Sequence, residues 1–512
     1  MEQTQSLLEH STTEVISDTR KRRITVWLRK YGKYAILAAL VIVPLFGYLG
    51  TLPIRLWDES RLASNAFEMY DTGHLLVTTF EYSPDLWNTK PPLLIWLQAG
   101  LMKVLGVNEW AVRLPSAVAG LLTCSLLLYL SRRYLNSFWF GFIALLVLVT
   151  SEGYITEHGT RTGDYDALLT LFTTLSALAF FAYCETTRNK YLYLVFAATA
   201  LAVLTKSIAG FLFVPALGIY AIIRGQVLPL LQNKHFYIGL LGCLGVIAGY
   251  YLLREAVSPG YLQAVWHNEL GGRYLQVNEN HSGDFWFYYY GFMELKLTAW
   301  YLLVPCGFAV GLLLKNHRMN RLALFCAVMV VGFFLVISVS KTKLHWYDIP
   351  LYPFLSLLIA MVVYAVFDAL RHLTWVNQHM RSNIWPFVFL FLLAINPYRK
   401  TLDRTYTPEE NPGDKVFFDI GYFLKDALKG KQDITGYSLL YEGFNTHNLF
   451  YLYALRDNGT RLDFQDWTNL KPGELVIVPQ EHIKQYVREH YEQEVVEEIG
   501  TITKFRIHGK KQ

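Results

Sequence analysis

Acidic residues beside apolar segments are the first candidates for chemistry, because an ionised side chain close to a bilayer is costly unless it is used. Asp58 directly follows the first apolar block, in the run Trp57-Asp58-Glu59-Ser60-Arg61. An ordinary hydrated loop charge is the alternative explanation. We take Asp58 as the leading catalytic carboxylate. Glu59 belongs to the same candidate set, although on a helical turn it should point elsewhere.

A second acidic pair lies in the run RTGDYD (161–166), just before another apolar block. Asp164 and Asp166 are two residues apart, so they can converge on one divalent cation. Alternatively, one faces a substrate while the other caps the following helix. Asp166 therefore joins the catalytic candidates and Asp164 forms a second acidic site. A metal held by both is possible, but the spacing establishes no firm metal site.

Basic residues at the ends of apolar blocks predict an anion site. Lys90 and Lys206 have no acidic residue beside them in the sequence, and a lysine at membrane depth is a natural partner for a lipid phosphate. Snorkelling to the headgroups explains such a lysine almost as well. Lys341, Lys343 and Tyr347 add two cations and an aromatic ring, which an interfacial anchor belt also explains.

Apolar blocks must position these residues. The chain has 512 residues, of which 53% are hydrophobic and 17% charged. The blocks are roughly 15 to 20 residues long, enough to cross about 30 Å of hydrocarbon. We expect an all-α polytopic membrane protein with about eleven spans. They are 34–52, 112–130, 137–153, 167–184, 191–205, 208–223, 236–253, 297–314, 322–339, 349–367 and 384–396.

The basic residues lie in short clusters between these blocks, which indicates topology rather than nucleic-acid binding. The basic segment 1–33 is expected in the cytoplasm. Successive spans of the transmembrane domain 34–396 cross the membrane in opposite directions. From a cytoplasmic start, the regions 53–111 and 254–296 and the tail from 397 are therefore external. Within the first of these regions, the apolar stretch 91–107 is expected to be a juxtamembrane helix, because Lys103 would be costly inside a span.

The tail 397–512 changes character. Charged helical stretches alternate with strand-like runs, such as 475–478 and 499–507, so a small soluble α/β domain is predicted. No Walker or Rossmann motif is present in the sequence. Since an external active site would not normally meet nucleotide sugars, a sugar donor should be a lipid.

These motifs, in this order, resemble those of the GT-C polyprenyl-phosphate-sugar glycosyltransferases, which include the bacterial lipid A aminoarabinose transferases and the protein O-mannosyltransferases. The resemblance rests on the residues at 58–61, 90–94, 108–116, 161–166, 204–206 and 340–353.

The resemblance implies a GT-C fold in a bacterial inner membrane, with an active site that faces the periplasm. It implies a polyprenyl (undecaprenyl) phosphate donor held by Lys90, Lys206 and Arg61, inversion at the sugar, and a lipid A, lipopolysaccharide or protein acceptor. Asp58 would take the acceptor proton or position the acceptor. No cofactor is required by this scheme, although a divalent cation is possible.

Two departures leave the donor sugar open. The family often has Glu where this chain has Thr89, and often Gly-Pro where it has Ser207 and Ile208. A transporter or flippase of lipid-linked sugars is the main alternative, since it too needs buried charge in a helical bundle. Transporters usually show broken midplane helices in related halves, whereas the charge here lies at span ends. A non-catalytic envelope scaffold is a third possibility.

Overall fold

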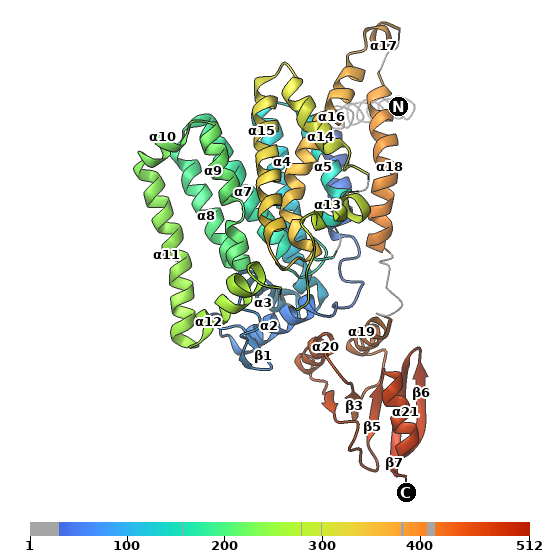
Figure 1. Cartoon of the computed structure of the whole chain (residues 1–512). Helices are drawn as coiled ribbons and strands as arrows, with labels where there is room; N and C mark the ends of the chain where they lie inside the picture. Colours follow the sequence, from blue (N-terminus) through green and yellow to red (C-terminus); the bar gives the residue numbers. More distant parts are fainter. Residues whose placement is uncertain are drawn as a thin grey trace, which may run out of the picture.

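A helical bundle and a small sheet domain make up the molecule (Figure 1). The computed structural model describes residues 30–511 except 156, 278, 298, 380–382 and 407–414. Most of the basic N-terminal segment expected in the cytoplasm therefore lies outside the described residues. The expected class, a helical membrane protein with a small C-terminal α/β domain, is confirmed.

Each predicted span coincides with a helix. Among the described residues, six helices are long and apolar enough to cross a membrane, and α5, α9 and α14 are shorter apolar helices. The predicted spans correspond to a first helix (30–46) and to α4 (Glu109–Tyr134), α5 (Phe138–Val149), α7 (Asp166–Thr186), α8 (Asn189–Lys206), α9 (Val214–Ile223), α11 (Lys234–Val257), α14 (Leu303–Leu313), α15 (His317–Val339), α16 (Tyr352–Arg371) and α18 (Trp385–Tyr406).

Several of these helices begin at a side-chain cap. The side chains of Asn108, Ser137, Asn233 and Asn316 accept hydrogen bonds from the first free backbone N–H groups of α4, α5, α11 and α15. Asn and Ser are favoured at this position because their oxygen atoms satisfy donors that the helix leaves without a partner. The polar residues between apolar blocks thus fix where the helices start.

Juxtamembrane helices lie at one end of the bundle. Figure 1 shows α2 (Asp58–Thr72) and α3 (Leu93–Leu105) at the end that faces the sheet domain, and α10 and α17 at the opposite end. At about 1.5 Å per residue, α3 is near 20 Å long, too short to cross about 30 Å of hydrocarbon. This agrees with the expectation that 91–107 is not a span.

Short elements complete the bundle. They are the β1 (Thr79–Phe80) and β2 (Ser83–Pro84) hairpin, α6 (Glu152–Ile155), η1 (Ser207–Phe211), α10 (Val227–Leu231), α12 (Tyr261–Val265), η2 (Trp266–Tyr274), α13 (Phe287–Gly291), η3 (Phe292–Lys296), η4 (His345–Leu351) and α17 (Thr374–His379).

The C-terminal domain is a five-stranded mixed sheet in the order β4-β3-β5-β7-β6. β3 runs parallel to β4 and β5, whereas β7 pairs antiparallel with β5 and β6. The domain begins later than predicted, because α18 continues through Pro397 to Tyr406. Its elements are α19 (Lys415–Leu428), β3 (Tyr437–Leu440), α20 (Thr446–Asp457), β4 (Asp463–Gln465), β5 (Leu475–Val478), α21 (Glu481–His490), β6 (Tyr491–Ile499) and β7 (Ile502–Lys510).

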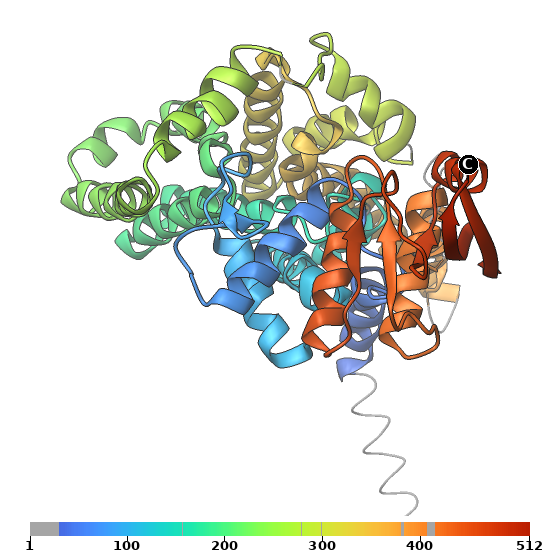
Figure 2. The ribbon, with the colours of Figure 1, turned by 90° about the horizontal axis from the view of Figure 1, so that it is seen from below.

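Buried polar contacts fasten this domain to the bundle. The Tyr451 hydroxyl donates to Glu109 Oε1 at 2.7 Å and accepts from the Ile54 backbone N–H at 2.9 Å. Lys425 Nζ donates to the carbonyls of Gly50 and Thr51. Seen from below, the domain overlies part of the bundle and leaves α11 uncovered (Figure 2). The segment that leads into Asp58 is therefore held between the two parts.

Candidate active site

Asp58 is the first residue of α2, where its carboxylate meets the positive end of the helix dipole. The preceding residue, Trp57, has φ 70° and ψ −121°, which is a strained conformation for a residue with a Cβ atom. Its ring stacks on Phe444 of the C-terminal domain, with 4.7 Å between the ring centroids. The backbone that presents Asp58 is thus fixed by packing from the other domain.

His158 joins Asp58 to the second acidic site, a role that the sequence did not reveal. Its Nδ1 lies 3.3 Å from Asp164 Oδ2 and 3.9 Å from Asp58 Oδ2. The ring stacks on Trp346, with 3.6 Å between the centroids. Burial alone would lower the pKa of His158, but the two carboxylates outweigh it and raise the pKa to about 9. At neutral pH the group is therefore an imidazolium.

Asp164 is buried beside this imidazolium. It also accepts a 2.6 Å hydrogen bond from the Thr162 hydroxyl. Burial favours a raised pKa, but His158 and Thr162 stabilise the carboxylate more strongly, and the pKa of Asp164 lies below its ordinary value. Asp164 is therefore ionised at neutral pH.

Asp166 turns the other way, toward Lys206. Lys206 Nζ donates to both carboxylate oxygens at 2.6 Å, and both side chains are less than 10% exposed. The premise that Lys206 lacks an acidic neighbour is therefore wrong. Asp166 is 40 residues away in sequence, and the packing of α7 against α8 brings the two together. Of the three ammonium N–H donors, one remains for a further acceptor.

Lys90 has a carboxylate partner as well. Its Nζ lies 3.5 Å from Glu269 Oε1, and the Thr89 hydroxyl donates to the same oxygen at 3.3 Å. Glu269 comes from the external region 254–296 and is not among the predicted site residues. In the structure it is buried and places a carboxylate beside Thr89, the position at which the resembled family often carries Glu.

One small cavity brings most of the predicted site residues together. Asp58, Asp164 and Asp166 lie on its walls with two of the candidate lysines, Lys90 and Lys206. Tyr347 also lines it, and its ring centroid is 5.2 Å from Lys206 Nζ. The cavity therefore unites chain segments that are far apart in sequence. Its lining includes Asp58, Trp87, Asn88, Lys90, Asp164, Tyr165, Asp166, Lys206, Trp346 and Tyr347.

An apolar groove of about 300 Å³ adjoins this cavity and shares Lys90, Asp166, Lys206 and Tyr347 with it. The groove thus has a polar end with two lysines and an apolar body. That combination fits a phosphate attached to a long hydrocarbon chain. The apolar body is lined by Leu169, Ile208, Ala209, Phe211, Leu212, Pro215, Phe333, Val336 and Ile337.

Arg61 and Glu59, predicted as site residues, lie outside both cavities. The Arg61 guanidinium is paired with Asp85 at 2.8 and 2.9 Å. Glu59 accepts hydrogen bonds from Arg113 at 2.7 and 2.9 Å, where both side chains are almost fully buried. It also accepts from the Gly163 backbone N–H at 2.9 Å. Glu59 thus points away from Asp58, as expected, and ties α2 to α4.

The two lysines of the later motif also lie outside the lining of these cavities. Lys341 is exposed. Lys343 is buried, and its ammonium group donates to the carbonyls of Ser338 and Ser340 at the end of α15. Cations are favourable at a helix C-terminus, where carbonyl groups are left without partners. Of the three candidates Lys341, Lys343 and Tyr347, Tyr347 is the one that lines the two cavities.

The two acidic residues of the 161–166 run do not converge on a common point, since Asp166 contacts Lys206 and Asp164 contacts His158. Within the described residues, the group that could hold a cation is Asp58, His158 and Asp164, whose ligand atoms lie within 4.8 Å of one another. His158 would have to lose its proton to be a ligand. A cation would therefore be held by this group rather than by the Asp164–Asp166 pair.

Comparisons with known proteins agree with this architecture. The family of dolichyl-phosphate-mannose-protein mannosyltransferases matches residues 89–251. An uncharacterized protein of Aquifex aeolicus is 26% identical over 72% of this chain and 70% of its own length. The undecaprenyl phosphate-alpha-4-amino-4-deoxy-L-arabinose arabinosyl transferase of Shewanella sediminis is 29% identical over 64% of this chain. This chain spans about 60% of that relative's length.

The fold is shared with a solved structure. The crystal structure of ArnT from Cupriavidus metallidurans bound to undecaprenyl phosphate superposes with a TM-score of 0.68 at 16% identity. The match covers 93% of this chain and 98% of that one. The related enzymes favour a transferase over the transporter or scaffold alternatives. The chain has the GT-C fold, and its sequence is similar to those of membrane glycosyltransferases named for polyprenyl-phosphate sugars.

Proposed function

We propose that this protein transfers a sugar from a polyprenyl phosphate, such as undecaprenyl phosphate, to a cell-envelope acceptor. The observation that carries the proposal is the junction of the two cavities, where Asp58 shares a wall with the lysines at the polar end of an apolar groove. The named activity of the relative from Shewanella sediminis supports this donor class.

The charge balance of the groove suits the reaction. Lys90 and Lys206 are each paired with one carboxylate, so these two ion pairs carry little net charge before the donor binds. The donor phosphodiester then brings one negative charge to the polar end of the groove. As the bond between the sugar and the phosphate breaks, the leaving phosphate gains negative charge. The two ammonium groups stabilise that developing charge, which lowers the barrier more than it tightens ground-state binding.

Asp58 acts on the acceptor. If the acceptor is a hydroxyl, the carboxylate takes its proton as the oxygen attacks the anomeric carbon, the new glycosidic bond forms and the carrier phosphate leaves. Attack from the side opposite the leaving group inverts the anomeric centre. If the acceptor is already ionised, Asp58 positions it. His158 and Asp164 hold the surroundings of Asp58 in place.

The orientation that we propose places this site on the periplasmic face of a bacterial inner membrane. The juxtamembrane helices and the C-terminal domain lie at one end of the bundle, whereas α10, which lies between Arg224 and Lys234, is at the other (Figure 1). Positively charged loops favour the cytoplasm. The acceptor is then an envelope component, such as lipid A, lipopolysaccharide or a protein.

A transfer assay tests the proposal. The purified full chain is incubated with radiolabelled undecaprenyl-phosphate sugars, one sugar at a time, and with extracted envelope lipids and proteins. Lys90→Met combined with Glu269→Gln, which removes both charges of this buried pair, should slow transfer at least tenfold, because the donor phosphate loses a cationic partner. Lys341→Met is the matched control, since this lysine is exposed outside the groove. Equal rates for the two variants would contradict the proposed donor site.

A further inference from the structure

An aromatic contact joins the C-terminal domain to the segment that presents Asp58. Trp57, the residue before Asp58, stacks on Phe444 with 4.7 Å between the ring centroids and 10° between the ring planes. The Trp57 side chain is 62% exposed, so burial does little to hold its ring. Among the residues that the structure describes, no other ring packs on Trp57. The orientation of this ring therefore depends on a side chain from the other domain.

The backbone of Trp57 also has a conformation that must be held. Its φ of 70° and ψ of −121° lie in a region that residues with a Cβ atom rarely adopt. Such conformations persist only where the surrounding structure maintains them, and they are concentrated at functional sites. Without its contacts, Trp57 would relax to a negative φ and change the direction of the chain at the start of α2.

The first turn of α2 depends on the direction of the Trp57 carbonyl. This oxygen accepts hydrogen bonds from the Arg61 backbone N–H at 3.0 Å and from the Ser60 hydroxyl at 2.9 Å. Glu59 is fixed by its buried ion pair with α4. Asp58 thus lies between a fixed residue and a strained one, so a rotation at Trp57 would displace the Asp58 carboxylate.

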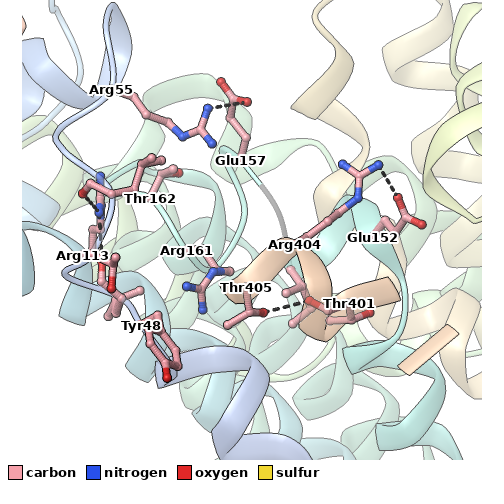
Figure 3. A pocket seen from close by; sticks show the side chains of 14 residues that line it. Tyr48, Arg55, Arg113, Glu152, Glu157, Arg161, Thr162, Thr401, Arg404 and Thr405 are labelled. Carbon is pink, nitrogen blue, oxygen red and sulfur yellow. Dashed lines mark hydrogen bonds and ion pairs between the residues drawn. The ribbon is translucent and has the colours of Figure 1, made fainter. Parts of the chain in front are cut away.

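Other contacts fix the backbone before Trp57. The Ile54 backbone N–H donates to the Tyr451 hydroxyl at 2.9 Å. Figure 3 shows Arg55 turned toward Glu157 of the loop 152–162, with which it forms an ion pair at 3.0 Å. These contacts fix the course of the segment, but they leave the orientation of the Trp57 ring to the aromatic stack.

Phe444 lies in a braced loop between β3 and α20. The Glu442 backbone N–H donates to Gln480 Oε1 at 2.7 Å, and the Gln480 side-chain amide donates to the Glu442 carbonyl at 3.0 Å. Gly443 follows with φ of 88°, a conformation that glycine adopts without strain. Phe444 is therefore presented to the bundle from a well-defined turn.

The docking of α20 on α2 keeps Phe444 opposite Trp57. A second stack joins Phe67 to Tyr453, with 4.7 Å between the ring centroids. The Tyr453 hydroxyl also donates to Glu68 Oε1 at 2.9 Å. Because the two stacks follow in the same order on both segments, α2 and α20 run parallel, with about 15 Å between the stacks at about 1.5 Å per residue. The position of the C-terminal domain is thus transmitted to the start of α2.

We propose that Phe444 is a positioning residue for the transfer reaction. Its ring holds Trp57, and Trp57 holds the first turn of α2 so that Asp58 stays on the wall of the active-site cavity. The inference rests on the proposed function, because Asp58 must act on the acceptor for its placement to affect the rate. The C-terminal domain then contributes to catalysis through this contact, although neither Phe444 nor Trp57 lines the two site cavities.

The transfer assay with radiolabelled undecaprenyl-phosphate sugars tests the inference. In Phe444→Ala, kcat should fall about tenfold to a hundredfold, because a misplacement of about 1 Å at a reacting group has effects of this size. The KM for the donor should stay within about twofold of the wild-type value, since the donor groove is unchanged. Phe444→Tyr keeps the ring and should restore kcat to within about threefold of the wild-type value.

The matched control is Trp467→Ala. Trp467 is a half-buried aromatic residue of the same domain, and its ring packs on Tyr486 rather than on the bundle. This variant should transfer sugar at the wild-type rate when it is assayed below its unfolding midpoint. Phe444→Leu protects the test against misfolding of Phe444→Ala, because leucine keeps an apolar side chain without the flat ring. Its kcat should fall at least about threefold.

A double-mutant cycle shows whether the two rings act together. Trp57→Ala should slow transfer about as much as Phe444→Ala, and the double variant should be slower than either by no more than about twofold, because both side chains act through one stack. Additive losses would overturn the inference. So would a wild-type kcat in folded Phe444→Ala or Phe444→Leu, or a Phe444→Tyr variant as slow as Phe444→Ala.

The same measurements separate this inference from the proposed function. If the wild type transfers sugar and Phe444→Ala transfers it equally fast, only the positioning role of Phe444 is refuted. If the wild type neither binds undecaprenyl phosphate nor transfers sugar, the proposed function is refuted, and this inference with it.

Discussion

Removing Lys206 tests two roles that the structure gives to one side chain. Its ammonium group neutralises Asp166 and faces the donor groove. In Lys206→Met the buried carboxylate would be left without its partner. Breaking a buried ion pair in this way typically costs about 3–5 kcal/mol, so the single variant should lose stability whether or not Lys206 binds substrate. Reduced activity in this variant alone would therefore prove little.

The double variant Asp166→Asn with Lys206→Met separates the two roles. It removes both charges, and such neutral replacements of buried pairs are often close to neutral in stability. Thermal unfolding in detergent should thus recover most of the wild-type midpoint. Donor binding should not recover, because one charged hydrogen bond to the phosphate is still missing. At about 1.5–3 kcal/mol, that loss corresponds to about a tenfold to hundredfold weaker affinity.

The assay is a binding titration with undecaprenyl phosphate, run beside the unfolding measurement. The control is Arg224→Gln with Glu185→Gln, a pair with one buried partner, joined at 3.2 Å and outside the lining of both site cavities. That control should bind undecaprenyl phosphate like the wild type. If the Asp166–Lys206 double variant is folded and binds within about twofold of the wild-type affinity, Lys206 is a purely structural residue and the donor-site argument fails.

Three further predictions follow from the surrounding contacts. Glu59→Gln should destabilise the protein by about 3–5 kcal/mol in thermal unfolding, because Arg113 loses its buried partner; a stable but inactive variant would instead favour a catalytic Glu59. The pKa of His158 is raised from 6.5 to about 9. The stability that its ion pairs contribute is therefore complete below about pH 6.5 and is lost as the pH rises through 9, which should lower the unfolding midpoint over that range. In His158→Gln, the midpoint should fall less over the same range. Cysteines introduced at Arg461 and Gln232, both exposed, should react from opposite sides of the membrane, with position 461 labelled from the periplasm.

The helices could be predicted from the sequence because neighbouring residues determine where each helix begins and ends. Each span is a block of apolar residues, and the caps at Asn108 and Asn316 are adjacent to the helices that they start. The same holds for α3, where thirteen residues are too few to cross the membrane. The start of the C-terminal domain was misplaced because Pro397 was taken as a boundary, whereas α18 continues through it.

Side-chain pairing was harder to predict because it depends on packing between distant segments. Nothing near Lys206 in the sequence indicates Asp166, and Glu269 is 179 positions from Lys90. His158 had no recognisable motif, yet it links two of the predicted carboxylates. Asp58, Asp166 and Lys206, which the sequence placed at the site and the structure brings together, lie at helix ends, where the topology determines the face of the membrane.

The same limit explains the residues that lie elsewhere. Arg61 and Lys343 are basic residues close to the site in sequence, but Asp85 and the carbonyls at the end of α15 take up their hydrogen-bond donors. Charge and position in the sequence predict that a residue is near the site. Which partner it finds there decides whether it is available to a substrate.

Transfer by Asp58→Asn is the measurement that tests the central claim most directly. The substitution keeps the size of the side chain and removes its charge. The proposed role predicts normal binding of undecaprenyl phosphate but sugar transfer slowed by about a hundredfold to ten-thousandfold, the usual cost of losing a general base. Asp71→Asn, at an exposed carboxylate of the same helix, should transfer normally. Transfer by Asp58→Asn at more than about a third of the wild-type rate would contradict the account.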